Sequence, residues 1–354
     1  MPLRVALDAT PILRTPTGVG AFVAGALAAL AARDDIEVRD YALSRRGAHA
    51  RRAPLPARAL LRLWERLDVP PVEWWAGSVD VVHGTNFVVP PARRAGRVAT
   101  VHDLTPVRFP ELASPTTRRF PALVRRAVER GALVHTPSAF VAAEVVDLLG
   151  ADPDRVAAVH HGVPPVAPAP TPPDVPRPYV LALGTVEPRK DLPSLVRAFD
   201  ALAAAHADLH LVVAGPDGWG ADALASAVEA ARHSRRIRRL PWVGDAERAG
   251  LLRHAAAFAY PSRYEGFGLP PLEAMSVDVP VVATSVGAVP EVVGDGAVLV
   301  PPGDADALAE ALARVLTDDE VRTALVARGR RRAASFSWDA CADGLARIYR
   351  RAAG

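Results

Sequence analysis

This sequence has few residues that could crosslink the chain or bind a metal through sulfur. Among its 354 residues there is one cysteine, Cys341, which excludes an intrachain disulfide and a cysteine-rich metal site. Its histidines and carboxylates show no spacing typical of a metal site either. We therefore expect a protein from a reducing compartment that works without a metal or another cofactor.

Lysine is almost absent as well. The chain has 42 basic residues, and Lys190 is the only lysine among them. An ammonium group is a compact charge on a flexible stem, whereas a guanidinium group is a planar fork, so the two are not interchangeable where an anion is bound. Lys190 is either an accident of composition or a mark of such a site within LALGTVEPRKDLPSLVRAFD, residues 181–200.

Aromatic residues and long apolar runs are scarce. Aromatic residues make up 6% of the chain although half of it is hydrophobic, which favours helices packed on a parallel sheet over a β-sandwich. No apolar run reaches about 18 residues, and the opening residues do not resemble a signal peptide, so we expect a soluble, cytoplasmic protein. The pI near 9.4 suggests nucleic-acid binding, but no basic run is interleaved with stacking aromatics, and we expect none.

Apolar runs typical of strands alternate with helical patterns along the whole chain, which predicts βαβ units and parallel sheets. Residues 164–178, PPVAPAPTPPDVPRP, interrupt the alternation with proline. We therefore predict an α/β protein with domains at 1–165 and 179–335, a linker at 166–178, and a final helix at 336–354 that packs back on the first domain. The predicted strands are 3–8, 79–84, 97–103, 132–138, 155–162, 179–184, 209–214, one ending near 243, 256–260 and 280–284.

Two motifs in the second domain could bind a phosphorylated ligand. TVEPRKD places Arg189 and Lys190 after the strand that ends at Gly184, and a helix should begin at Asp191. YEGFGLPPLEAM places Glu265 before a helix and Glu273 inside it. Cations and helix-start amides can hold a diphosphate, and a carboxylate can accept both hydroxyl hydrogens of a ribose. Taken singly, each motif also fits solvated surface charges.

The first domain has two weaker candidates. Gly18 and Gly20 open a helix after the first strand, where backbone amides can approach an anion. His102 ends a strand and is followed by Asp103, so it can contact a sugar hydroxyl or form a purely structural pair.

In this order and spacing the motifs resemble those of the retaining GT-B glycosyltransferases of family 4, which include many bacterial mannosyltransferases. The resemblance runs through TGVG, VHDLTPVRFPE, LALGTVEPRKDL and YPSRYEGFGLPPLEAM. It implies a GT-B fold, with two Rossmann-like domains facing across an interdomain cleft. Many members have an arginine after the glycine at Gly184, where this chain has Thr185, so Arg189 should take that role.

The resemblance also assigns roles to residues. Arg189 and Lys190 should hold the donor diphosphate, while Gly18 and Gly20 should approach its distal phosphate. Glu273 should bind the ribose, with Glu265 and His102 beside the donor sugar. The resemblance implies that the remaining donor contacts come from Thr185, Gly266, Phe267, Gly268 and Leu269.

The expected reaction is metal-independent, retaining transfer of a hexose from a nucleotide sugar to a hydroxyl group. GDP-mannose is the first expectation for the donor, followed by UDP-sugars and GDP- or TDP-deoxysugars. The acceptor could be a lipid-linked glycan or a small molecule. Two other functions remain open, a GT-B nucleotide-sugar epimerase and a non-catalytic partner subunit that binds sugar nucleotides.

One basic segment bears on the acceptor. Residues 44–66 contain seven arginines and one acidic residue, and an amphipathic helix is predicted at 56–67. Such a segment is typical of contact with an anionic membrane, although a solvated helix in an arginine-rich protein would look similar.

Overall fold

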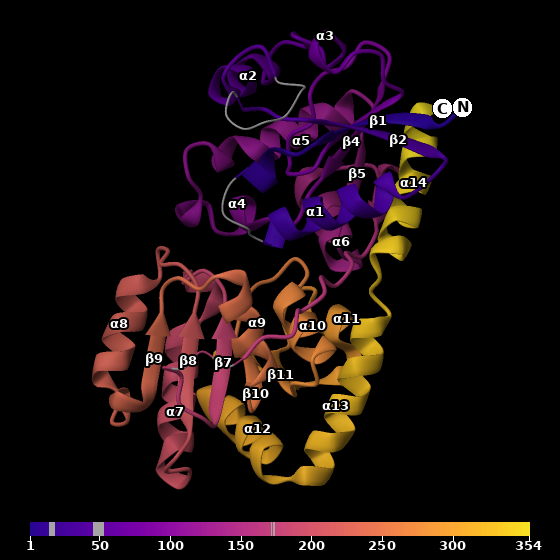
Figure 1. The fold of residues 1–354 in the computed structure, drawn as a ribbon. Helices are drawn as coiled ribbons and strands as arrows, with labels where there is room; N and C mark the ends of the chain where they lie inside the picture. Colours follow the sequence, from indigo (N-terminus) through magenta and orange to yellow (C-terminus); the bar gives the residue numbers. More distant parts are fainter. Residues whose placement is uncertain (14–17, 45–52, 171, 173) are drawn as a thin grey trace. The chain divides into compact units, whose positions relative to one another are not determined.

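The computed structural model describes residues 1–13, 18–44, 53–170, 172 and 174–354. The chain divides into two compact units, of which the first combines Met1–Gly162 with Phe336–Gly354 and the second is Val163–Ser335. Figure 1 shows the elements of both units in sequence colours. Each unit is described separately below.

The first unit is an α/β layer structure around a parallel sheet, which has six strands in the described residues and the order β2-β1-β3-β4-β5-β6. Its strands are β1 (Leu3–Asp8), β2 (Ile36–Tyr41), β3 (Val81–Gly84), β4 (Gly96–Thr100), β5 (Leu133–Thr136) and β6 (Val156–Ala158). Its helices are α1 (Gly18–Ala31), α2 (Ala57–Trp64), α3 (Glu73–Ala76), α4 (Thr105–Arg108), α5 (Phe120–Glu129), α6 (Ala139–Leu149) and α14 (Trp338–Ala353).

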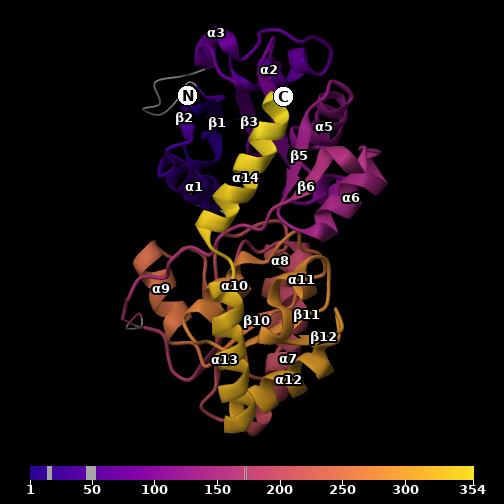
Figure 2. The same cartoon turned by 90° about the vertical axis from the view of Figure 1, so that its right-hand side faces the viewer.

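Alternation along the strands divides the core of the first unit between two faces of the sheet. Val5 and Leu7 pack in one cluster with α1 and α14, whereas Ala6 packs in another with α2, α5 and α6. Figure 2 shows α14, in yellow, lying in front of this sheet with α1 beside it. The last helix of the chain therefore completes the core of the first unit.

Glycine allows close contact between α14 and the rest of this unit. A Cβ atom added at Gly25 of α1 would lie 2.3 Å from the ring of Trp338, and one added at Gly162 would lie 2.5 Å from the same ring. Tyr349, also on α14, is fully buried, and its hydroxyl lies 2.7 Å from Nδ1 of His83 in β3. Ring packing and a buried hydrogen bond thus hold α14 at both of its ends.

The second unit repeats this architecture with a parallel sheet that again has six strands in the described residues, in the order β12-β11-β10-β7-β8-β9. Its strands are β7 (Tyr179–Leu183), β8 (His210–Ala214), β9 (Ile237–Leu240), β10 (Ala257–Tyr260), β11 (Val281–Thr284) and β12 (Ala297–Val300). Its helices are α7 (Leu192–Ala205), α8 (Ala221–Ala230), α9 (Asp245–Arg253), α10 (Leu269–Ser276), α11 (Val289–Val293), α12 (Ala305–Thr317) and α13 (Asp319–Ala334).

This strand order places the ends of β7 and β10 side by side, because the two strands are hydrogen-bonded neighbours. The motif after β7 and the motif after β10 therefore lie at the same edge of the sheet, although about 75 residues separate them in sequence. Helix α10, which follows β10, packs against β10, β11, α9 and α13. The topology alone thus brings both candidate motifs together.

Several predicted elements differ from the observed ones. The edge strands β2 and β12 were not predicted, and the strand expected to end near residue 243 ends at Leu240. The predicted linker carries no helix or strand in its described residues. It packs on α9, where Arg253 Nε donates to the carbonyl of Ala167 at 2.8 Å and His254 Nε2 donates to that of Ala169 at 3.1 Å.

Candidate active site

The loop after β7 carries the predicted cations on a short 3₁₀ helix, Pro188–Lys190. Gly184 has φ +139°, which L side chains rarely adopt, and a Cβ atom at Gly215 would lie 2.3 Å from the Gly184 carbonyl oxygen. Thr185 follows, and its carbonyl accepts from the N–H of Glu187 at 2.9 Å. Two glycines thus let the ends of β7 and β8 approach closely, and the chain then turns Arg189 and Lys190 toward β10.

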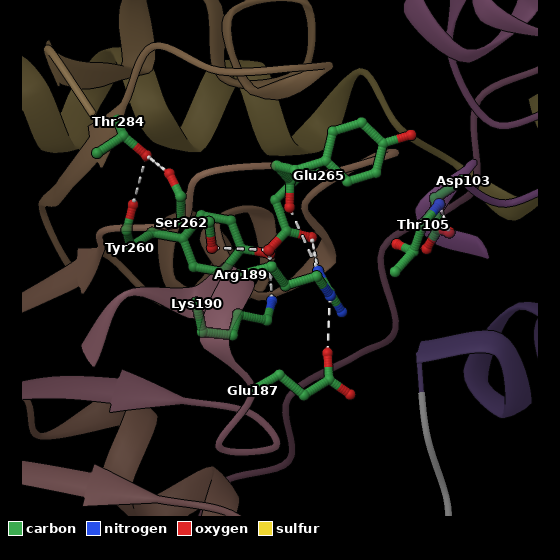
Figure 3. A network of polar contacts seen from close by, with 10 residues as sticks. Asp103, Thr105, Glu187, Arg189, Lys190, Tyr260, Ser262, Glu265 and Thr284 are labelled. Carbon is green, nitrogen blue, oxygen red and sulfur yellow. Dashed lines mark hydrogen bonds and ion pairs between the residues drawn. The ribbon is translucent and has the colours of Figure 1, made fainter. Parts of the chain in front are cut away.

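Lys190 lies in a compact polar cluster and is mostly buried. Its Nζ donates to Glu265 Oε1 at 2.6 Å and to the hydroxyl of Tyr260 at 2.9 Å, and its side chain is 11% exposed (Figure 3). The ammonium also lies 4.5 Å from the centre of the Tyr260 ring. Burial lowers the pKa of Lys190, and the carboxylate of Glu265 opposes that shift.

Arg189 approaches the same carboxylate from the other side. Its Nη1 donates to Glu265 Oε2 at 2.9 Å, and its Nε donates to Glu187 Oε2 at 2.7 Å. Figure 3 shows Arg189 and Lys190 converging on Glu265, with Ser262 adding a hydrogen bond of 2.7 Å. We call Glu187, Arg189, Lys190, Tyr260, Ser262 and Glu265 the cation cluster.

Glu265 is the buried centre of the cation cluster, with a side chain that is 7% exposed. Burial alone would raise its pKa, but the charges of Arg189 and Lys190 and the hydrogen bonds from Lys190 and Ser262 outweigh that effect and lower the pKa to about 2. Glu265 is therefore ionised at neutral pH. A carboxylate whose two oxygens are both occupied by cations is a poor nucleophile.

Helix α7 begins directly after the cations, at the predicted residue but with a different cap. Asp191 occupies the N-cap in the left-handed region, with φ 45°, and its side chain makes no capping hydrogen bond. Its carboxylate instead accepts from Arg263 Nε at 2.9 Å. The expected cap is thus replaced by an ion pair between the β7 loop and the β10 loop.

The segment Gly266–Leu269 connects Glu265 to α10. Phe267 and Leu269 are buried, and Gly268 has φ +109°, a conformation suited to glycine. Pro270 and Pro271 have no N–H group, so backbone donors at this helix start come from the residues before them and from Leu272. The N–H groups predicted to contact the donor are therefore those of the segment Gly266–Leu269.

Glu273 lies within α10 and has a partner that the sequence did not predict. Arg248 of α9 donates from Nη1 to Oε1 at 3.0 Å and from Nη2 to Oε2 at 2.5 Å, so the contact is bidentate. The Glu273 side chain is 5% exposed and that of Arg248 is 33% exposed. The predicted ribose carboxylate thus lies at the same sheet edge as the cation cluster, with its charge balanced by a guanidinium group.

The predicted residues of the first unit also lie near one another. His102, which follows β4, donates from Nε2 to the carbonyl of Thr85 at 2.8 Å, and its ring packs edge-on against Phe22 of α1 at 5.3 Å. Gly18 and Gly20 form the start of the same helix. Burial lowers the pKa of His102, so the ring is neutral at pH 7.

His102 is not paired with Asp103 by a hydrogen bond, although the sequence left that pairing open. The carboxylate of Asp103 accepts from the backbone N–H of Thr105, the first residue of α4, at 2.9 Å. The His161 ring packs on Phe22 as well, with 4.2 Å between ring centres. His102 is thus held by a backbone carbonyl and by aromatic neighbours.

Four functional candidates were missed in the sequence: Glu187, Arg248, Tyr260 and Ser262. Tyr260 and Ser262 are polar residues at the end of a buried strand, just before the predicted glutamate, and that position was a usable signal. The sequence contains no such signal for Arg248, because its contact with Glu273 arises from the packing of α9 on α10. Within the described residues, no group of three or more histidine, cysteine or acidic side chains could hold a metal ion.

Comparison with known proteins identifies two family models along the chain. Residues 16–167 match "Glycosyltransferase Family 4", and residues 167–332 match "Glycosyl transferases group 1". O-antigen chain mannosyltransferase B of Escherichia coli is 34% identical over 282 residues, which cover 76% of this chain and 74% of that protein.

Solved structures with a similar fold cover almost the whole chain. Sucrose-phosphate synthase from Thermosynechococcus elongatus gives a TM-score of 0.76 at 21% identity, covering 99% of this chain and 98% of that one. Anabaena HepE in complex with UDP and glucose gives a TM-score of 0.74 at 17% identity, covering 98% of each chain. At such identities the likeness concerns the fold alone.

Proposed function

Because this chain belongs to the family 4 glycosyltransferases, with a two-domain α/β fold of the GT-B type, we propose that it transfers a hexose from a nucleotide sugar to a hydroxyl group with retention at the anomeric carbon. The proposed donor is GDP-mannose. The mannosyltransferase name of the Escherichia coli relative supports the sugar. UDP-sugars and GDP- or TDP-deoxysugars are the alternatives.

The cation cluster carries this proposal. Breaking the bond between the anomeric carbon and the phosphate leaves negative charge on the diphosphate, and fixed cations in a partly buried site stabilise that charge. Lys190 uses two of its hydrogens on Tyr260 and Glu265, and within the described residues the third remains for a phosphate oxygen. Arg189 supplies the second positive charge, and we propose that no metal is needed.

Glu265 has a different role from a nucleophile in this proposal. Its carboxylate holds Arg189 and Lys190 in place and balances their charge before the donor binds. The acceptor oxygen then attacks the anomeric carbon from the side of the departing diphosphate, and its proton passes to a phosphate oxygen. The new bond therefore has the configuration of the broken one. We propose further that His102 lies beside the donor sugar and that Gly18 and Gly20 approach the distal phosphate.

The donor can be identified by ligand-induced stabilisation. A nucleotide that binds only the folded chain raises its melting temperature, so GDP, UDP and TDP are compared at equal concentrations. We expect GDP to give the largest shift, and GDP-mannose then to be consumed in the presence of an acceptor. If no nucleotide raises the melting temperature, the nucleotide-sugar proposal fails.

The acceptor is proposed to be a lipid-linked glycan at an anionic membrane. One part of the predicted contact, residues 45–52, lies outside the described residues. The helix predicted at 56–67 is observed as α2, and its Leu60, Leu61 and Trp64 are buried in the core, so they do not face a membrane. The opposite face exposes Arg58 and Arg62, and Arg66 is exposed just beyond the helix.

Exposed apolar residues lie close to these arginines in sequence. Trp74 of α3 is 60% exposed, and the guanidinium of Arg93 lies 5.7 Å from the centre of its ring. Leu67 and Val69 are also exposed. We name Arg58, Arg62, Arg66 and Trp74 the basic surface, and we propose that it contacts anionic headgroups electrostatically. None of the described helices is long and apolar enough to span a bilayer.

A further inference from the structure

The strongest feature outside the proposed catalytic cluster is the contact between Arg248 and Glu273. Both oxygens of the carboxylate accept from one guanidinium, at 3.0 and 2.5 Å, and the carboxylate is 5% exposed. A bidentate pair fixes the plane of the carboxylate as well as its position. The orientation of Glu273 is therefore set before any ligand arrives.

A purely structural role does not account for the pair. Helix α10 is already fixed by packing, because Leu272, Ala274 and Met275 are fully or almost fully buried. A buried ion pair commonly adds little net stability, since desolvation of the two charges offsets their attraction. Arg248 is also one-third exposed, so the guanidinium is accessible from solvent at the edge where the cation cluster lies.

The geometry leaves acceptor capacity on Glu273. An ionised carboxylate has about four lone-pair positions, and the Arg248 fork uses one on each oxygen. One position remains on each oxygen, so the carboxylate can still accept from a ribose hydroxyl. Arg248 also neutralises the carboxylate, so that Glu273 can accept from neutral hydroxyls without repelling a nearby diphosphate.

We propose that Arg248 is a positioning residue for nucleotide recognition: it presents the free lone pairs of Glu273 to the ribose hydroxyls of the donor. This inference rests on the proposed nucleotide-sugar function and adds a residue to it. It predicts that Arg248 controls how strongly the protein distinguishes ribonucleotides from 2′-deoxyribonucleotides.

The test is calorimetric titration of the wild-type chain and its variants with GDP and 2′-deoxy-GDP, or with the corresponding uridine pair if UDP gives the larger thermal shift. We expect Arg248→Leu to weaken binding of the ribonucleotide about tenfold, because a hydrogen bond to a charged group is worth about that much, and to weaken binding of the deoxynucleotide much less. Arg248→Lys keeps the charge but not the planar fork, so its affinity for the ribonucleotide should lie between those of wild type and Arg248→Leu.

A matched control lies on the same helix. Arg253 binds backbone carbonyls of the preceding proline-rich segment, so Arg253→Leu should leave the ratio of the two affinities unchanged. With the donor sugar, Arg248→Leu should raise KM and leave kcat within about threefold, the pattern of lost ground-state binding.

Two results would overturn the inference. One is an Arg248→Leu protein with a lower melting temperature but the wild-type ratio of affinities, which would make the pair structural. The other is a wild-type protein that binds both nucleotides equally, which would mean that Glu273 does not contact the 2′-hydroxyl of the ribose. Failure of the proposed function looks different, because then neither nucleotide binds the wild-type chain.

Discussion

At the scale of single residues, the chain places its only lysine in a buried polar cluster, where it donates to Glu265. We expect Lys190→Ala to lower kcat/KM on the order of 100-fold, the usual effect of removing one group that stabilises developing negative charge. Lys190→Arg should also be impaired, because a planar fork cannot fit between Tyr260 and Glu265 as the ammonium does. Steady-state kinetics and circular dichroism measure activity and folding.

The control for this substitution is Arg330→Ala, which removes an exposed cation that pairs with Asp278 in the same domain. It should retain wild-type kinetics. Near-normal kcat/KM in Lys190→Ala would mean that the position of the lone lysine is an accident of composition.

A second residue-scale prediction concerns acid stability. The pKa of Glu265 is lowered from 4.5 to about 2 in the folded chain, so the carboxylate stabilises the fold above pH 4.5 and this contribution disappears as pH falls to 2. A shift of that size corresponds to about 3 kcal/mol. The stability difference between wild type and Glu265→Gln should therefore be largest at neutral pH and shrink between pH 4.5 and 2.

Urea unfolding at several pH values measures this difference. Glu310→Gln changes an exposed glutamate of α12 and serves as the control. A constant difference for Glu265→Gln would mean that the ion pairs do not set its protonation.

The sequence predicted half of the cation cluster and one residue of the pair between Arg248 and Glu273. Arg189, Lys190 and Glu265 could be grouped because each follows a strand, and parallel strands end at one edge of a sheet. Arg248 could not be predicted, because nothing in the sequence fixes how α9 lies on α10. The strand end at Gly184 was predicted, but the close approach of Gly215 was not, because it depends on the neighbouring strand β8.

At the scale of elements, two glycines of α1 differ in the space available for a side chain. We expect Gly25→Ala to destabilise the protein by about 3 kcal/mol, because its new methyl group would overlap the Trp338 ring at 2.3 Å. Gly18→Ala adds a methyl group that meets no described atom within 4 Å. Its melting temperature should stay near that of wild type, whereas its KM for the donor should rise if this helix start approaches a phosphate.

Differential scanning calorimetry and donor titration separate the two effects. An unchanged melting temperature in Gly25→Ala would contradict the described packing of α14 on α1. An unchanged donor KM in Gly18→Ala would mean that Gly18 is not part of the donor site.

The basic surface gives a second prediction for an element. Replacement of Arg58, Arg62 and Arg66 by glutamine should abolish cosedimentation with vesicles containing phosphatidylserine, because α2 contributes charge and not its buried apolar face. Wild-type binding should weaken as salt is raised. Equal binding by the wild-type and triple-variant proteins, or none by either, would contradict the proposal.

The edge strands β2 and β12 were not predicted, whereas the edge strands β6 and β9 were. Strand β2 alternates charged and apolar residues in IEVRDY, as an edge strand with partly solvated side chains can, and so lacks the apolar run that identified the central strands. Strand β12 is short and follows a glycine-rich turn. The central strands were predicted because burial on both faces makes them continuously apolar.

At the scale of the whole molecule, two domains of the same architecture share one chain. The first domain receives its last helix from the far end of the sequence, with the Trp338 ring between two glycines. Proline content and the restart of the strand–helix alternation were enough to predict two domains. That they face across a cleft stays a prediction, as does the assignment of the acceptor to the first domain.

The central claim is metal-independent, retaining transfer from a nucleotide sugar, and nuclear magnetic resonance of the reaction product tests it most directly. The purified chain is incubated with GDP-α-mannose and a polyprenyl-diphosphate-linked saccharide in the presence of EDTA. We predict release of GDP and a product with an α-linked mannose. A β-linked product, loss of activity in EDTA, or an isomerised donor sugar without transfer would contradict the account.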